Sequence, residues 1–157
     1  MRTHAFPEHV TFRRARTGDL WAAANFWLSM YAEIGIFREA DFEPGWRERF
    51  VRYFEARTAA SEAQYFVACD GDRVVGTAGA LIRDGYPSVI HGVRFGYILG
   101  VYVDPEFRSL GIAKRLTQDA IAFLRSAGVR NIRLHASKAG RPIYEKIGFT
   151  PTNEMQV

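Results

Sequence analysis

The sequence predicts an α/β protein in which a mixed β-sheet carries helices on both faces. Two observations lead to this fold class. The first half of the chain contains two apolar runs joined by Asp70-Gly71-Asp72, a tight turn of the kind that connects antiparallel strands. The second half alternates strand and helix patterns, an order typical of parallel strands connected through a helix. The length of 157 residues suits one domain, so residues 1–157 are expected to form a single unit.

The first elements along the chain are predicted to be a strand and two helices. Residues 11–15 are a short strand candidate, and Thr17 then offers a helix N-cap. Apolar residues follow from position 20 to position 31 with helical spacing. The second helix is expected to begin near Pro44, because proline suits a first helical turn. Its aromatic residues fall on one face, which favours core packing and also suits one wall of a substrate pocket.

The middle of the chain is predicted to form three strands. Residues 64–69 and 73–82 are the two arms of the hairpin, and residues 83–94 are expected to be a loop. Residues 95–103 form an uncharged run rich in β-forming side chains. This strand should end before Pro105, which cannot donate a ladder hydrogen bond.

The last third is predicted to alternate helix and strand. Residues 111–127 form a strongly amphipathic helix, and Gly128 is the expected left-handed terminator. Residues 131–137 then read as a strand and residues 141–146 as a short helix. Residues 149–157 are expected to form a final strand.

Composition narrows the class of protein. The formal net charge is +4, but 17 acidic residues interleave with 21 basic ones, which indicates a solvated surface and no nucleic-acid partner, with a small anionic ligand as a second interpretation. The only cysteine, Cys69, lies in an apolar stretch and excludes a cysteine-rich zinc site, so no metal is expected. The uncharged residues 20–32 are too few for a membrane helix, and the N-terminus lacks an apolar signal core. A cytoplasmic protein without a membrane partner is expected.

A phosphate-binding loop is predicted where the strand of residues 95–103 leads into the amphipathic helix. The segment there is Arg108-Ser109-Leu110-Gly111-Ile112-Ala113. A helix N-terminus offers unpaired N–H groups and a partial positive charge, which together suit a pyrophosphate. Gly111 lets the backbone approach the phosphates, and Arg108 adds a charged donor. The sequence contains no nucleotide P-loop and no dinucleotide-binding glycine motif. Taken alone, the segment also fits an ordinary helix start with a glycine.

A second segment, Tyr144-Glu145-Lys146-Ile147-Gly148-Phe149, follows one further strand, so it can return to the same end of the sheet. Tyr144 by itself fits a packed aromatic residue. Combined with the loop, its hydroxyl, with a reference pKa of about 10, suits protonation of a departing thiolate with a reference pKa of about 8.5.

Three segments together resemble the GCN5-related N-acetyltransferase (GNAT) family. They are Tyr97-Ile98-Leu99-Gly100-Val101-Tyr102-Val103, Asp104-Pro105-Glu106-Phe107-Arg108-Ser109-Leu110-Gly111-Ile112-Ala113, and the segment from Tyr144 to Phe149. The resemblance implies a GNAT-like fold, whose central strands, residues 95–103 and 131–137, splay apart at one end and hold acetyl-CoA. It also implies an N-acetyltransferase, in which a primary amine of a small molecule or peptide attacks the thioester directly.

The resemblance also implies roles for individual residues. The pantetheine arm would lie along Val101 and Val103, and the N–H of Val101 would polarise the thioester carbonyl. The pyrophosphate would be held by Arg108, Ser109, Leu110, Gly111, Ile112 and Ala113. Tyr144 matches the general acid of the family. Ser137 stands near the position where family members often carry asparagine, which makes it a further expected contact to the cofactor.

The acceptor side is predicted in outline only. In the family the first two helices and the loop expected at residues 83–94 select the acceptor, and the expected pocket residues are Trp27, Tyr31, His91 and Tyr97. The candidates for the general base are His91, Tyr97, Tyr102 and His135, each of which also fits a structural role. Two functional classes stay open: an enzyme, or an acyl-CoA-binding sensor of the same fold without turnover. Many members of the family are dimers, so a homodimer is one expectation.

Overall fold

A computed structural model describes residues 6–90 and 92–157. Its strands form one five-stranded sheet. Its strands lie in chain order, and the order is β1 (Val10–Arg14), β2 (Ala63–Asp70), β3 (Arg73–Ser88), β4 (Gly92–Val103) and β5 (Ile132–Leu134). Neighbours from β1 to β4 pair antiparallel, whereas β4 and β5 pair parallel. The predicted mixed sheet is therefore confirmed.

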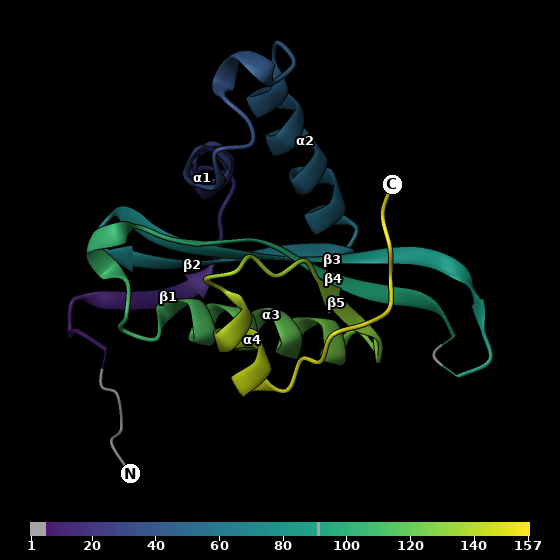
Figure 1. The fold of residues 1–157 in the computed structure, drawn as a ribbon. Helices are drawn as coiled ribbons and strands as arrows, with labels where there is room; N and C mark the ends of the chain where they lie inside the picture. Colours follow the sequence, from purple (N-terminus) through teal and green to yellow (C-terminus); the bar gives the residue numbers. More distant parts are fainter. Residues whose placement is uncertain (1–5, 91) are drawn as a thin grey trace.

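Helices cover both faces of this sheet, as the sequence predicts (Figure 1). One face carries α1 (Asp19–Ile34) and α2 (Trp46–Ala59), and the other carries α3 (Ile112–Ser126) and α4 (Arg141–Ile147). Two short 3-10 turns, η1 (Glu39–Asp41) and η2 (Pro105–Phe107), lie in the connections before α2 and α3. Among the described helices, none is both long and apolar enough to span a bilayer.

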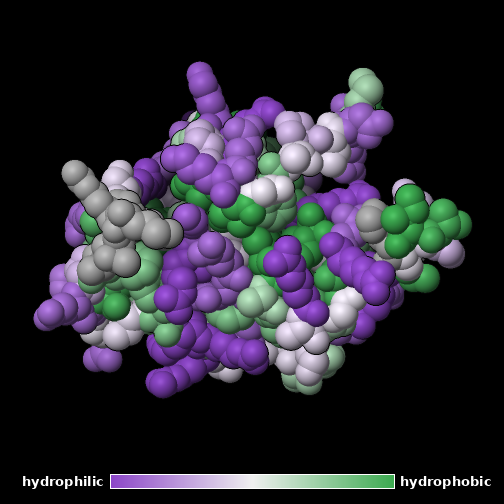
Figure 2. All heavy atoms as spheres, turned by 90° about the horizontal axis from the view of Figure 1, so that it is seen from below, coloured by the Kyte–Doolittle hydropathy of each residue, from purple (hydrophilic) through white to green (hydrophobic). Residues whose placement is uncertain are grey.

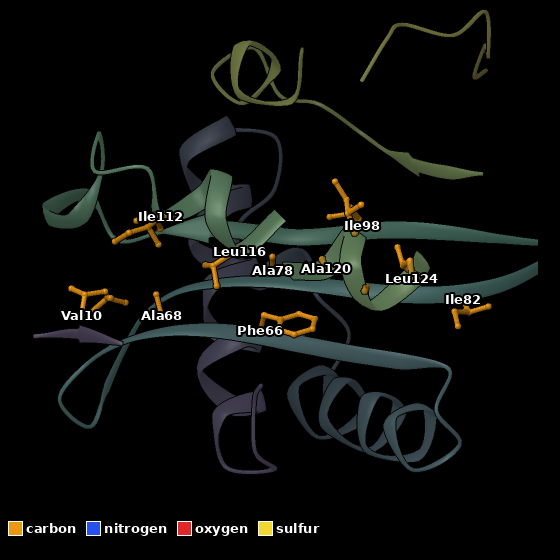
Figure 3. Close-up of a cluster of buried hydrophobic side chains, with 14 of the residues drawn as sticks. Val10, Phe66, Ala68, Ala78, Ile82, Ile98, Ile112, Leu116, Ala120 and Leu124 are labelled. Atoms are coloured by element: carbon orange, nitrogen blue, oxygen red, sulfur yellow. The ribbon is translucent and has the colours of Figure 1, made fainter. Parts of the chain in front are cut away.

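The larger core lies between α3 and the sheet. Leu116, Ala120 and Leu124 recur at helical spacing and are completely buried. Figure 3 shows these three side chains of α3 over the sheet residues Ala78 and Ile98, which belong to the same buried cluster. Because a fully buried leucine stabilises a fold by roughly 1.5–3 kcal/mol, this face fixes α3, and with it the start of the helix, against β4.

The predicted loop over residues 83–94 is wrong, because most of it is strand. β3 continues to Ser88 and β4 begins at Gly92, with Arg83 opposite Phe95. The ring of Phe95 packs so closely on the backbone of Gly85 that an added Cβ would lie 3.2 Å from it, which favours the hairpin over a loose loop. The end of this hairpin exposes the large side chains Tyr86, Val89, Ile90 and Val93. Figure 2 shows a group of hydrophobic residues at the right-hand end of the molecule, the side on which the hairpin ends in Figure 1.

The predicted final strand over residues 149–157 is also wrong, because the structure has no strand there. β5 is the edge strand of the sheet and covers only Ile132–Leu134 instead of the predicted residues 131–137. It therefore offers few backbone groups with which a further strand could form hydrogen bonds. Pro151 removes one donor from the tail, and residues 151–157 are all exposed, so no buried face holds them in extended form.

Candidate active site

The β5-facing edge of β4 is open at its C-terminal end. The parallel ladder begins at Gly96 opposite Ile132 and ends at Ile98 opposite Leu134. β5 stops there, whereas β4 continues to Val103, so no described strand pairs with this edge beyond Ile98. An extended ligand can hydrogen-bond to such an edge as an additional strand would. The side chains of Val101 and Val103 pack towards the α3 core, so a ligand at this edge would meet their backbone, apart from the Val103 carbonyl, which accepts from Arg108.

A bulge at Gly100 bends β4 at the start of this open edge. Thr77 lies opposite Tyr102 and Gly79 opposite Leu99, so β4 has one residue more than β3 in this stretch. Gly100 has a φ of +59°, and the Thr77 hydroxyl donates to its carbonyl at 2.8 Å. The bulge therefore shifts the residues that follow, beginning with Val101, by one position relative to β3.

Two aromatic side chains fill the space beside this bulge. The indole N–H of Trp27 donates to the hydroxyl of Tyr65 at 3.0 Å, and burial raises the pKa of that phenol. A Cβ at Gly100 would lie 2.7 Å from both polar atoms of the pair. Only glycine therefore fits here, both in its backbone angle and in the space that remains.

Replacing Gly100 with alanine is expected to destabilise the fold by about 3 kcal/mol or more, because left-handed strain of roughly 1–3 kcal/mol adds to a clash of similar cost. Urea unfolding measures the change. Gly128→Ala is the matched control, since Gly128 has a φ of +79° but no atom within 4 Å of its added Cβ. Equal losses in the two variants would contradict the packing argument.

The predicted phosphate loop presents a run of unbonded backbone donors. Ser109 and Gly111 have left-handed φ angles of +63° and +84°, and Gly111 is the N-cap of α3 without a side-chain cap. The first helical hydrogen bond runs from the N–H of Arg115 to the carbonyl of Gly111. The N–H groups of residues 109–114 donate to no residue that the structure describes. Such a concave run of donors at the positive end of a helix fits a diphosphate.

Arg108 borders the loop and is held in place by two other parts of the chain. Its Nε donates to the carbonyl of Val103 at 2.9 Å, and its Nη2 donates to the Glu33 carboxylate at 2.8 and 3.0 Å. The Tyr102 hydroxyl donates to the same carboxylate at 2.6 Å. The edge of the loop is thus connected to α1, which lies on the face of the sheet opposite α3 (Figure 1).

Tyr144 lies in α4, which packs against α3. Its side chain is buried, and burial raises its pKa to about 12, so the hydroxyl keeps its proton at neutral pH. It makes no hydrogen bond to a described residue. The ring edge lies 2.9 Å from where a Cβ on Gly140 would be, so that glycine is needed for its position. Ser137 is exposed and accepts from the N–H of Gly140 at 3.1 Å, so here it shapes the turn into α4.

The acceptor residues predicted from the sequence fall into two groups. Trp27 and Tyr31 belong to one aromatic cluster between α1 and α2, with ring centroids 5.9 Å apart. Tyr97 packs instead on His135, with centroids 5.6 Å apart. His91 lies outside the described residues. The described residues hold no group of three or more histidine, cysteine, aspartate or glutamate side chains that would suit a metal ion.

Comparison with known proteins identifies the family. The profile described as the Acetyltransferase (GNAT) family matches residues 31–149, which is most of the chain. The chain belongs to the GNAT family. The splayed central strands that this membership implies are the parallel pair β4 and β5, whose ladder ends at Ile98 and Leu134.

Individual relatives agree with this GNAT assignment. A mycothiol acetyltransferase of Geodermatophilus obscurus is 31% identical over 147 residues, which is 92% of this chain and 46% of that protein. A glucosamine 6-phosphate N-acetyltransferase of Trypanosoma brucei brucei is 38% identical over 78 residues, covering 49% of this chain and 51% of that protein. The chain thus spans about half the length of these relatives. A crystal structure of a predicted acetyltransferase with acetyl-CoA from Clostridium acetobutylicum superposes with a TM-score of 0.83 at 26% identity, covering 94% of both chains.

Sequence reasoning missed the partners that hold this GNAT site. Thr77 and Tyr65 support the bulge from β3 and β2, and nothing in their local sequence indicates it. Nothing in the local sequence indicates that Glu33 accepts hydrogen bonds from Tyr102 and Arg108. Gly100 itself carried a usable signal, because an isolated glycine inside a strand run is typical of a bulge.

Proposed function

We propose that this chain is an acetyl-CoA-dependent N-acetyltransferase that acts on a primary amine of a small molecule or peptide. The observation that carries the proposal is the run of N–H groups at residues 109–114, which donate to no described residue and adjoin the open edge of β4. Family membership supports the same donor, since a structural neighbour was determined with acetyl-CoA. The match covers only about half the length of the two relatives, so the acetyl transfer by this chain is proposed from its own site.

The donor would be held by backbone more than by side chains. In this arrangement Val101 and Val103 bind the pantetheine arm along the open edge. Residues 109–114 bind the pyrophosphate through their N–H groups, and Arg108 contributes a charged donor. Acetyl-CoA supplies an activated thioester, which the amine attacks with release of the coenzyme A thiolate. The N–H of Val101, set by the bulge at Gly100, would polarise the thioester carbonyl.

Tyr144 would give its proton to the leaving sulfur. Its pKa of about 12 keeps it protonated until the step occurs, and no described hydrogen bond has to be broken first. The same burial would raise the pKa of the departing thiol, which reduces the difference in acidity between the two groups.

The hydrogen-bond network narrows the candidates for the general base. Tyr102 is unsuited, because burial and the neighbouring Glu33 carboxylate raise its pKa to about 12 and its proton is donated to that carboxylate. His135, packed on Tyr97 just after β5, remains a candidate among the described residues. Removal of water from around the amine would lower the amine's own pKa and lessen the demand on this base.

Two measurements test the proposal. Calorimetric titration with acetyl-CoA tests donor binding, and a thiol-release assay against a panel of amines tests transfer. The panel should include amino sugars, aminoglycosides and short peptides, because the relatives' names include a glucosamine 6-phosphate N-acetyltransferase. Absence of acetyl-CoA binding would refute the proposal. Binding without turnover on every amine would instead favour the acyl-CoA sensor.

A further inference from the structure

Glu33 connects two parts of the site that are far apart in sequence. It lies in the last turn of α1, the helix that also carries Trp27 and Tyr31. Its Oε1 accepts from the Tyr102 hydroxyl at 2.6 Å and from Nη2 of Arg108 at 2.8 Å. Its Oε2 accepts from the same Nη2 at 3.0 Å. One carboxylate therefore joins α1, the end of β4 and the edge of the phosphate loop.

These contacts orient Arg108 without using all of its donors. A guanidinium has five N–H groups in a rigid plane. Nε is bonded to the Val103 carbonyl and Nη2 to Glu33, and the group lies over the Tyr102 ring with 5.3 Å from Cζ to the centroid. Nη1 forms no hydrogen bond to a described residue. The plane is thus fixed, and one nitrogen is left for an anion.

The placement of Glu33 is unfavourable for α1 alone. A negative charge in the last turn opposes the helix dipole, and the last turn of α1 contains no basic residue to offset it. The ion pair contributes little stability either, since the Arg108 and Glu33 side chains are 42% and 45% exposed and solvent screens the attraction between them. A residue that conflicts with its own helix and adds little to stability is better explained by what it does to Arg108.

Glu33 is also in the right protonation state for this role. Burial raises the pKa of its carboxyl, but the hydrogen bonds from Arg108 and Tyr102 outweigh burial and hold the pKa below its usual value. The carboxylate stays ionised at neutral pH and is a weak proton acceptor. It suits the orientation of a cation and not the deprotonation of an amine.

We propose that Glu33 is a positioning residue, which holds Arg108 so that its free nitrogen meets the diphosphate of the acyl donor. The inference rests on the proposed function, because it needs acetyl-CoA as the ligand. The alternative is that the Glu33 carboxylate competes with the phosphate for Arg108. Removal of the Glu33 charge should weaken acetyl-CoA binding if Glu33 positions Arg108, and strengthen it if Glu33 competes.

The test compares Glu33→Gln with the wild type by calorimetric titration with acetyl-CoA. The dissociation constant should rise about tenfold, the size expected when a charge-assisted hydrogen bond to an anion is weakened. In an Arg108→Ala background Glu33→Gln should add no further loss, because Glu33 acts through that side chain. Turnover with acetyl-pantetheine, which lacks the diphosphate, should change less than twofold.

The matched control is Glu62→Gln. Glu62 pairs with Arg57 at 2.6 Å with similar exposure of both side chains, but at the start of β2, and its loss should leave acetyl-CoA affinity unchanged. Unchanged or tighter binding by Glu33→Gln, or an equal loss with acetyl-pantetheine, would overturn the inference and leave the proposed function standing. Failure of the wild type to bind acetyl-CoA would overturn both.

Discussion

Replacing Tyr144 with phenylalanine should lower kcat by about a hundredfold or more, while the dissociation constant of acetyl-CoA changes less than about twofold. General acids typically contribute factors of roughly 10²–10⁴. Phenylalanine keeps the ring that packs beside Gly140 and Phe149, and no described hydrogen bond is lost with the hydroxyl. The fold and the acetyl-CoA site should therefore be preserved in Tyr144→Phe, and only the proton for the leaving sulfur should be lost.

Single-turnover kinetics and calorimetric titration separate the two effects. Tyr86→Phe is the matched control, because Tyr86 is 78% exposed on the β3–β4 hairpin and removal of its hydroxyl should leave acetyl-CoA binding and the rate of the chemical step unchanged. If Tyr144→Phe weakened binding and turnover equally, Tyr144 would be a binding residue and not the acid.

The pH dependence of kcat gives a related expectation. Burial raises the pKa of Tyr144 to about 12, and a group with a raised pKa keeps its proton until the pH approaches that value. Between about pH 7 and about pH 10, ionisation of Tyr144 should therefore not lower kcat. Any fall of kcat in this range should be present in the wild type and in Tyr144→Phe alike. A fall in that range that the variant abolishes would mean that the phenol ionises earlier and is not the proton donor in the form described.

Local sequence was sufficient for the features that depend on neighbouring residues. The apolar residues of α3 recur at helical spacing, and Gly111 stands at the start of the helix. Both the helix and its N-terminal loop can therefore be predicted from a short stretch of sequence. The order of strands and helices was likewise readable as far as α4, because each apolar run has the period of its element.

Features that depend on distant contacts were not readable from local sequence. The pair of Arg108 and Glu33 joins residues 75 positions apart, and the Trp27–Tyr65 pair joins residues 38 apart. The hairpin past Ile82 looked like a loop because Gly85 and Pro87 break local strand propensity, yet cross-strand packing on Phe95 overrides it. The tail looked like a strand because its residues permit one, but strand formation needs a partner edge that β5 does not provide.

Replacing Gly111 with valine should abolish acetyl-CoA binding, with the dissociation constant raised by at least about a hundredfold. Gly111 has a φ of +84°, which a β-branched residue does not readily adopt, so the backbone at the helix start must rotate. That rotation re-aims the neighbouring N–H groups, and the loss of two hydrogen bonds to a charged ligand accounts for a change of this size. The fold should survive, because the nearest atom to an added Cβ is on Phe6 at 3.8 Å.

Gly128→Val separates this effect from strain in general. Gly128 follows α3 at its other end, has a φ of +79° and has no atom within 4 Å of an added Cβ. Both variants should lose roughly 1–3 kcal/mol of unfolding free energy through backbone strain. Only Gly111→Val should lose acetyl-CoA binding, measured by calorimetric titration at a temperature where both variants are folded. Equal affinities in the two variants would mean that the phosphates are not held at the start of α3, and the donor site would have to be sought elsewhere along β4.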